Sequence, residues 1–172
     1  LTLCLAFSLL PTAALADGEG TQTNGVAQIG STGYATLAEA VAAVADGGTV
    51  KLLKNVELKV AMGTSGKLVP QMTVSGKHVT LDLAGYTIGY SAESKTSNVT
   101  GTPAVFDVVD GAELTVEGNG TIDAELGGNG SYGFNVKGGK LIINDGTYYG
   151  APSAVQVHEG EAVIKGGFFD LA

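Results

Sequence analysis

The stretch FNVKGGKLIINDGTYYG, residues 134–150, decides the expected fold, because VQVHEGEAVIKGGFFD repeats its pattern at residues 155–170. Apolar residues and glycines recur at an offset of 21, while the polar residues between them change. The matched pairs are Phe134 with Val155, Val136 with Val157, Gly139 with Gly160, Ile143 with Ile164, Gly146 with Gly167, and Tyr148 with Phe169. A core and its tight turns keep their residue types, so the pattern predicts successive repeat units stacked in register.

Two earlier pairs of stretches repeat at longer offsets. GKHVTLDLAG (residues 76–85) matches GAELTVEGNG (residues 111–120) at an offset of 35, and FDV at Phe106 matches FNV at Phe134 at an offset of 28. The offsets shorten as the segments between the repeats shorten, which is typical of a repeat core with loops of variable length. Apolar and polar residues alternate within each run, as in short strands with one buried face. These features predict an all-β solenoid.

One helix is expected before these strands. Leu37, Ala40, Val41 and Val44 form an apolar stripe at helical spacing. Thr36 and Glu39 have the spacing of a capping box, in which each side chain accepts a hydrogen bond from a free backbone N–H. The glycines after Asp46 provide a stop signal. The sequence therefore predicts a helix at about residues 36–46, followed by a strand at residues 49–53.

The helix, followed by ADGGTVKLLKNV, KHVTLDLAGYTI and GAELTVEGNGTID, resembles the right-handed parallel β-helix of pectin-lyase-like proteins. It is most similar to the β-helix domains of large surface proteins from Gram-positive gut bacteria, in which a helix caps the N-terminal end. The resemblance covers about residues 26–172 and implies a right-handed parallel β-helix with an N-terminal capping α-helix. A β-sandwich or a meander is the alternative architecture, since its strands also recur with turns.

The N-terminal residues have the composition of an export signal. LTLCLAFSLLPTAALA, residues 1–16, is uncharged and apolar and ends in a small-x-small cleavage pattern, which predicts a signal peptide truncated at its N-terminus. The alternative is a buried N-terminal strand or helix. We expect a linker at residues 17–27 and one domain at residues 28–172 that continues beyond them. Removal of Cys4 leaves no cysteine, and export without disulfides fits a bacterial surface protein better than a small disulfide-stapled secreted domain.

The charge of the chain argues against several partners. The net charge is −8 and the chain contains no arginine, so no basic patch is available to neutralise nucleic-acid phosphates. The same negative charge disfavours anionic membranes, and it disfavours anionic polysaccharides unless calcium bridges the two. Beyond residues 1–16, no stretch predicts a membrane span.

No catalytic motif stands out in the sequence. Pectate lyases use an arginine base, and polygalacturonases use Gly-His-Gly and Arg-Ile-Lys segments, none of which is present. The outward carboxylates of Asp82, Asp107, Glu117 and Asp123 are interpreted as a solvated polar face, with a hydrolytic pair as the alternative. His78 and His158 have no partner at a motif spacing and are expected to be lone exposed imidazoles. We therefore predict no catalytic residue, no cofactor and no metal ligand.

Calcium and glycans are the ligands that the sequence leaves open. Asp107, Asp110 and Asp123 fall in one repeat and offer oxygen ligands, although the nonapeptide calcium repeat is absent. Aromatic residues follow the ends of several repeats, and alternation turns one residue of each adjacent pair outward, where rings stack on sugars. The candidate glycan-stacking residues are Tyr86, Tyr148, Tyr149 and Phe168. The alternative is that one ring of each pair packs inside and the other covers a corner.

These inferences predict a non-enzymatic scaffold of an adhesin-like protein, secreted and attached to the cell wall, that contacts a polysaccharide or a host-surface glycan. Its other partners would be downstream domains of the same polypeptide. The alternative is the N-terminal part of a polysaccharide lyase or glycoside hydrolase whose catalytic repeats lie downstream.

Overall fold

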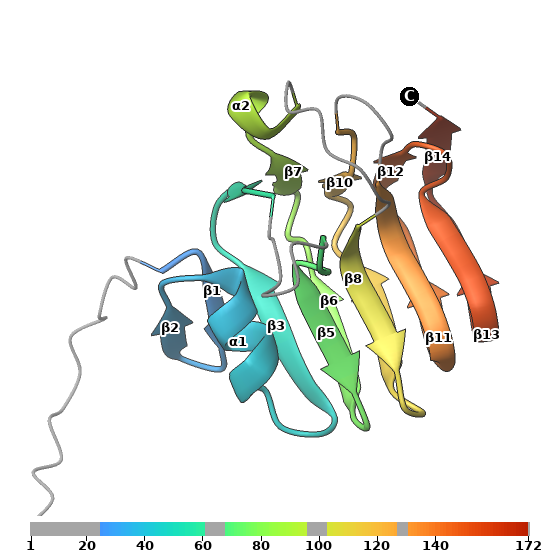
Figure 1. Cartoon of the computed structure of the whole chain (residues 1–172). Helices are drawn as coiled ribbons and strands as arrows, with labels where there is room; N and C mark the ends of the chain where they lie inside the picture. The colour runs from blue at the N-terminus through green and yellow to red at the C-terminus, as the bar shows by residue number, and fades with distance from the viewer. Residues whose placement is uncertain (1–24, 61–67, 96–102, 127–130, 172) are drawn as a thin grey trace, which may run out of the picture.

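The computed structural model describes residues 25–60, 68–95, 103–126 and 131–171 (Figure 1). The predicted signal peptide, residues 1–16, and residues 17–24 of the predicted linker lie outside the described residues. The first strand begins at Ala27, which is buried, one residue before the predicted start of the domain.

The described residues form mostly β-strands and two short helices. In chain order the elements are β1 (Ala27–Ile29), β2 (Thr32–Tyr34), α1 (Leu37–Ala43), β3 (Gly48–Leu52), β4 (Val56–Leu58), β5 (Met72–Ser75), β6 (His78–Asp82), β7 (Thr87–Tyr90), α2 (Ala92–Lys95), β8 (Ala104–Val109), β9 (Glu113–Glu117), β10 (Thr121–Asp123), β11 (Tyr132–Ile143), β12 (Thr147–Gly150), β13 (Val155–Ile164) and β14 (Phe168–Leu171).

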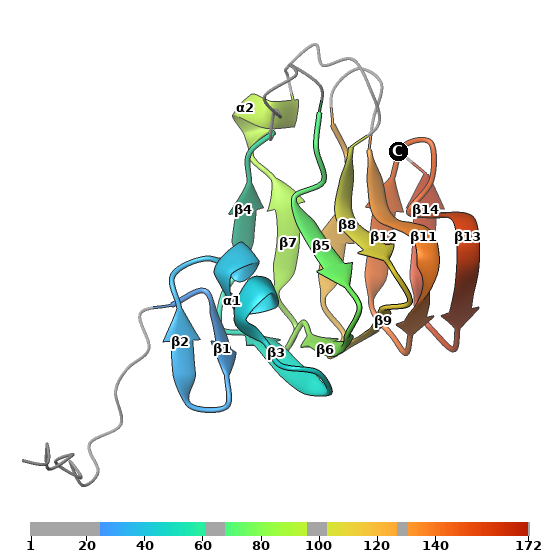
Figure 2. The same cartoon turned by 60° about the horizontal axis from the view of Figure 1, so that its bottom comes forward.

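Within the described part of the chain, these strands form two sheets around one core (Figures 1 and 2). The larger sheet has nine strands in the order β2-β1-β3-β6-β9-β11-β8-β5, with β13 also paired to β11. This sheet is mixed, because β1 runs antiparallel to both β2 and β3. The smaller sheet has five parallel strands in the order β14-β12-β10-β7-β4.

The predicted fold class, an all-β solenoid in the form of a right-handed parallel β-helix, is wrong. The structure has a mixed nine-stranded sheet that curls around the core and a separate parallel sheet, which together are not a clear β-helix. Two features account for the difference. The antiparallel hairpin of β1 and β2 adds strands that the repeat pattern did not contain. In addition, β11 continues through Gly138 and Gly139, where a corner was expected, and pairs with both β8 and β9.

The predicted registers are confirmed as parallel strand pairings. Val79 lies opposite Leu114, Phe106 opposite Phe134, and Tyr148 opposite Phe169, at the offsets of 35, 28 and 21 read from the sequence. A slip of one residue would turn the apolar face of a strand toward solvent, so burial of one face fixes these registers.

Helix α1 begins where the capping box predicted and ends earlier than expected. The Thr36 side chain accepts a hydrogen bond from the Glu39 N–H, and the Glu39 carboxylate accepts one from the Thr36 N–H. The helix ends at Ala43, and Val44 adopts an extended backbone as its C-cap; Gly47 has φ of 74° three residues later. Leu37, Ala40 and Val41 are buried, so this short helix is held by its packing on the core.

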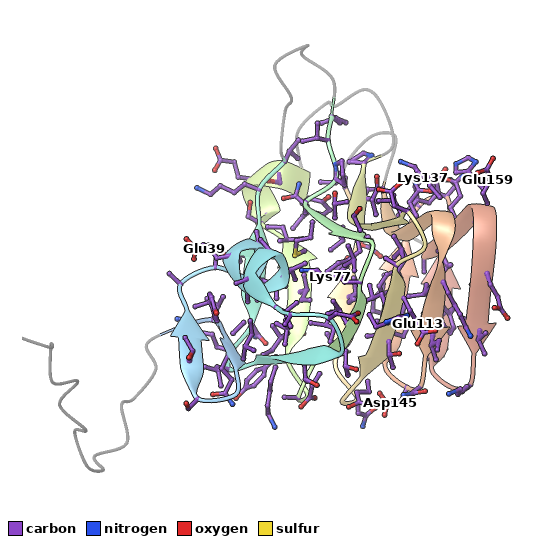
Figure 3. All side chains as sticks on the ribbon, turned by 90° about the horizontal axis from the view of Figure 1, so that it is seen from below. Glu39, Lys77, Glu113, Lys137, Asp145 and Glu159 are labelled. Carbon is purple, nitrogen blue, oxygen red and sulfur yellow. The ribbon has the colours of Figure 1, made fainter. Side chains whose placement is uncertain are left out.

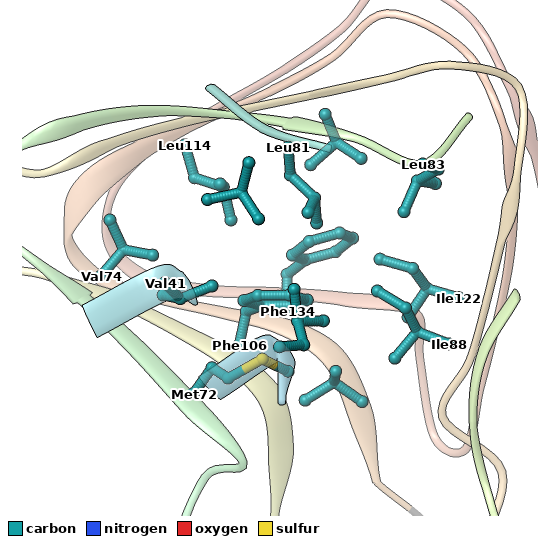
Figure 4. Close-up of a cluster of buried hydrophobic side chains, with 14 of the residues drawn as sticks. Val41, Met72, Val74, Leu81, Leu83, Ile88, Phe106, Leu114, Ile122 and Phe134 are labelled. Atoms are coloured by element: carbon teal, nitrogen blue, oxygen red, sulfur yellow. The ribbon is translucent and has the colours of Figure 1, made fainter. Parts of the chain in front are cut away.

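The core is a stack of side chains contributed by successive strands (Figure 4). The Phe106 and Phe134 rings are stacked with centroids 5.7 Å apart, and the Phe134 and Tyr148 centroids are also 5.7 Å apart. The Phe169 ring extends the stack, 5.0 Å from Tyr148. The aromatic column therefore runs from β8 through β11 and β12 to β14.

Candidate functional site

The outer surface of the five-stranded sheet presents two in-register columns of side chains, and we call this surface the outer sheet face. The residues between these columns point into the core, as the burial of Ile88, Ile122 and Tyr148 shows. The columns themselves are half-buried or exposed. The first column contains Thr87, Thr121, Thr147 and Phe168, and the second contains Glu57, Gly89, Asp123, Tyr149 and Asp170.

Tyr149 and Phe168 are the aromatic residues of the outer sheet face. Tyr149 lies opposite Asp170, and Phe168 lies opposite Thr147, so the two aromatic residues occupy diagonal positions on adjacent strands. Strand spacing and rise place such positions roughly 8 Å apart. Phe168 is 56% exposed and Tyr149 is partly exposed. The two rings thus border a patch that also contains the Thr147 hydroxyl and the Asp123 carboxylate.

Tyr148 does not belong to this patch, and its assignment as a glycan-stacking residue is wrong. Its side chain is fully buried between the rings of Phe134 and Phe169. The Tyr148 hydroxyl donates a hydrogen bond to the Asp145 carbonyl oxygen. Burial, with the nearby Asp145 charge as a smaller cause, raises the pKa of Tyr148. The expectation that one ring of each adjacent pair packs inside is confirmed for Tyr148 and Tyr149.

Tyr86 lies apart from the other candidates. It precedes β7 at a corner of the fold and is 36% exposed, and its carbonyl oxygen accepts a hydrogen bond from the Thr121 N–H. Tyr86 directly precedes Thr87 of the first column, just as Gly120 precedes Thr121 on the adjacent strand. The four predicted residues therefore do not form one ladder of rings: Tyr149 and Phe168 share a surface, Tyr86 is at a corner, and Tyr148 is inside.

Three of the four carboxylates singled out in the sequence, those of Asp82, Asp107 and Glu117, make polar contacts with side chains that strand pairing brings beside them. Asp82 lies 3.3 Å from the Lys51 ammonium, and Asp107 accepts a hydrogen bond of 2.9 Å from Lys137. Glu117 accepts one of 3.4 Å from the Asn144 amide. Asp82 and Glu117 are half-buried on the outside of the nine-stranded sheet and fit the interpretation of a polar outer surface. Asp107 is only 7% exposed, so the expectation of a solvated carboxylate is wrong at this position.

The three aspartates considered as calcium ligands lie in different surroundings. Asp107 contacts Lys137, and Asp110 accepts a hydrogen bond of 2.7 Å from the Ser75 hydroxyl in the turn after β8. Asp123 lies on the outer sheet face, on the other sheet, and accepts a hydrogen bond from the Glu125 N–H. Among the described residues, no group of three or more His, Cys, Asp or Glu side chains is arranged to hold a metal ion. Calcium binding stays a prediction without a defined site.

His78 has a partner that the sequence did not reveal. The Asp46 carboxylate accepts a hydrogen bond of 2.7 Å from the His78 N–H and lies 3.0 Å from the ring Nδ1. The backbone hydrogen bond from His78 is the main cause that lowers the pKa of Asp46. The description of His78 as a lone imidazole is therefore wrong, because pairing of β3 with β6 brings these distant residues together. His158 is exposed on β13.

Buried polar groups are the other feature that sequence reasoning missed. Asn135 is 6% exposed, and its Oδ1 has no hydrogen-bond partner among the described residues. The Tyr90 hydroxyl also lacks a partner there, and burial raises its pKa. Interactions with the Ser131 and Gln71 side chains oppose this rise in the pKa of Tyr90. Nothing in the alternating sequence pattern marks these positions as buried.

Comparisons with protein-family models, with curated proteins and with solved structures found no match to this chain. Among the described residues, no helix has both the length and the apolar character that a membrane crossing requires.

Proposed function

We propose that this chain is a non-catalytic β scaffold of an exported, surface-attached protein and that its outer sheet face contacts neutral glycans. The observation that carries the proposal is the placement of Tyr149 and Phe168 on one surface, with Thr147 and Asp123 beside them. Aromatic rings offer a flat apolar face to the C–H groups of a sugar, while hydroxyl and carboxylate groups bind its hydroxyls.

The regular spacing of the outer sheet face suits an extended polymer. Thr87, Thr121 and Thr147 lie in register on three adjacent parallel strands. Adjacent strands are about 4.8 Å apart, so the threonine column repeats a donor and an acceptor at that interval along the sheet. Gly89 leaves this part of the surface without a side chain between Glu57 and Asp123.

The charge of the surface selects the class of glycan. Glu57, Asp123 and Asp170 share one column with Tyr149, and the whole chain has a net charge of −8. A polymer of uronic acids would be repelled by this column, whereas neutral hydroxyls donate hydrogen bonds to carboxylates. Neutral hexose polymers are therefore the preferred ligand class.

Export is supported by the sequence of residues 1–16 and by the absence of cysteine after Cys4. Secretion with cleavage after Ala16 predicts a mature N-terminus at Asp17. Mass spectrometry of the protein recovered from the cell surface tests this part of the proposal, and a chain that retains residues 1–16 would contradict it.

The glycan part is tested by affinity electrophoresis and calorimetry on soluble glucans, mannans and galactans, with polygalacturonate as the anionic comparison. We expect Tyr149→Ala and Phe168→Ala each to weaken binding about tenfold, because stacking on one ring contributes about 1 kcal/mol or more. Tyr86→Ala is the matched control, since Tyr86 is an exposed tyrosine outside the patch. Equal loss in all three variants, or binding of polygalacturonate alone, would overturn the assignment of this surface.

A further inference from the structure

Gly89 lies within the outer sheet face at a position where the fold does not require a glycine. It is the third of the four residues of β7, and its register partners are Glu57 on β4 and Asp123 on β10. Its backbone is not left-handed, and a Cβ at this position would lie 3.4 Å from the Asp123 Cβ and 3.8 Å from the Asp123 Oδ2, which are ordinary contacts. An alanine would therefore fit here without displacing a neighbour.

This absence of a structural requirement sets Gly89 apart from the glycines around it. Among the described glycines from Gly47 to Gly167, every one except Gly89 either has a left-handed backbone or would place a Cβ less than 3.0 Å from another atom. A glycine in the interior of a strand weakens the strand, because it has no side chain to pack and loses more backbone freedom on folding. The fold therefore loses stability at Gly89 without a steric reason within the described chain.

A glycine in the interior of a strand marks a bulge, a tight bend or a place where a ligand or another backbone approaches closely. The pairings of β7 with β4 and with β10 continue through Gly89 without a register shift, which excludes a bulge. Within the described chain, the three atoms nearest to the Cβ position all belong to Asp123, so no other backbone lies closer. Close approach of a ligand is the explanation that remains.

We propose that one ring of a neutral glycan lies on the β7 backbone at Gly89, between the side chains of Glu57 and Asp123, and that the glycan continues across β10 to Tyr149. This inference rests on the proposed function and names the position that sets its specificity. The Cα atoms of Glu57 and Asp123 are about 9.6 Å apart, which is twice the spacing of neighbouring strands. A ring between them has a carboxylate on either side to accept hydrogen bonds from its hydroxyl groups.

The chemistry around Gly89 suits a ligand rich in hydroxyl groups. Strand β7 pairs with β4 on one side and with β10 on the other, so its backbone has no free edge for a peptide strand. The ionised carboxylates of Glu57 and Asp123 accept hydrogen bonds and donate none, and sugar hydroxyls are donors. Tyr149, the register partner of Asp123 on β12, offers its ring to the next part of the same glycan.

Thermal unfolding without ligand tests whether the fold requires Gly89. Gly89→Ala is expected to raise the melting temperature by about 2 °C, because alanine removes the penalty of a glycine within a strand. A lower melting temperature would show that the fold itself needs glycine at this position, and it would overturn the proposal.

Calorimetry with soluble glucan and soluble mannan tests the contact with the ligand. We expect Gly89→Ala to weaken binding about fivefold and Gly89→Val about tenfold or more, because the added side chain holds the ring away from both carboxylates. Thr73→Val, which places the same side chain at an exposed position of β5 in the other sheet, is the control and leaves the affinity unchanged. A more stable fold that binds more weakly is a combination that a purely structural glycine does not produce.

The results distinguish the role of Gly89 from the function on which it rests. If the parent protein binds a neutral glycan and Gly89→Val binds it equally well, the role of Gly89 is overturned and glycan binding stands. If the parent protein binds neither glycan, the proposed function is overturned as well. Titration with a hexasaccharide of the bound glycan is expected to give one ligand per chain, and two ligands per chain would overturn the continuous path from Gly89 to Tyr149.

Discussion

The Lys77 ammonium lies 2.8 Å from the Val41 carbonyl oxygen and thereby caps the C-terminus of α1 (Figure 3). The same ammonium donates hydrogen bonds to the carbonyl oxygens of Val44 at 2.9 Å and Ala42 at 3.3 Å. These carbonyls end the helix and have no partner within it, and the negative end of the helix dipole attracts a cation. Lys77 precedes β6, so this contact attaches the helix to the nine-stranded sheet.

Lys77→Met is expected to destabilise the fold by about 1–3 kcal/mol, because it keeps the aliphatic stem and removes the charged donor. Chemical denaturation followed by circular dichroism measures the loss. Lys54→Met, in which an exposed lysine is changed in the same way, is expected to stay within about 0.5 kcal/mol of the parent protein. Equal effects of the two substitutions would show that Lys77 has no capping role.

The contact between Asp46 and His78 predicts a dependence of stability on pH. The pKa of Asp46 is below its ordinary value in the folded protein, mainly because its carboxylate accepts the His78 N–H. Its contribution to stability is therefore present above the unfolded pKa of about 4 and is lost as the pH falls through the lower folded pKa. Since Asp46 is exposed, the contribution is small.

Asp46→Asn is expected to be less stable than the parent at pH 6, and the difference is expected to shrink as the pH is lowered from about 4 to 2. Thermal unfolding across this range measures the difference, with Glu57→Gln, an exposed carboxylate on β4, as the control for the loss of one charge. A difference that stays constant with pH would contradict the role given to the ionised carboxylate.

Gly120 and Gly47 are each required for a different reason: Gly120 because a side chain has no space there, and Gly47 because its backbone is left-handed. A Cβ on Gly120 would lie 2.3 Å from the Tyr86 carbonyl oxygen and 2.6 Å from the Leu83 Cβ. Gly47 has a left-handed φ of 74° and open space around its Cβ position. We expect Gly120→Ala to cost about 3 kcal/mol by overpacking and Gly47→Ala to cost about 1 kcal/mol by backbone strain. Urea denaturation midpoints distinguish the two, and a larger loss at Gly47 would be inconsistent with the packing described.

The registers of the parallel strand pairs could be predicted from the sequence, but the arrangement of the strands in two sheets could not. Alternation and glycine spacing predicted that Phe106 pairs with Phe134 and Tyr148 with Phe169, because burial of one face permits a single register. The continuation of β11 through Gly138 depends on a local register shift, and the pairing of β1 with β2 depends on a three-residue strand. Neither leaves a periodic signal, so a fold inferred from repeats alone was wrong.

In the candidate site, too, the sequence predicted some features and missed others. Alternation correctly indicated that one residue of the pair Tyr148 and Tyr149 faces outward, but the register was needed to show which one. The partnership of Asp46 with His78 joins the turn before β3 to the first residue of β6, 32 positions apart in the sequence. Such contacts have no spacing rule in the sequence, because the length of the intervening segment is free to vary.

The aromatic column gives the sharpest prediction for the core. Phe134 is fully buried between Phe106 and Tyr148, and its removal would leave both neighbours without a packing partner. Phe134→Ala is expected to cost about 3–5 kcal/mol, whereas Phe134→Leu, which refills most of the volume, costs about 1–2 kcal/mol. Phe168→Ala is the control: this ring is 56% exposed, and its loss is expected to change stability by at most about 0.5 kcal/mol. Denaturation of the three variants, monitored at 222 nm, measures this order, and a Phe168 variant as unstable as Phe134→Ala would show that the outer sheet face is packed rather than open.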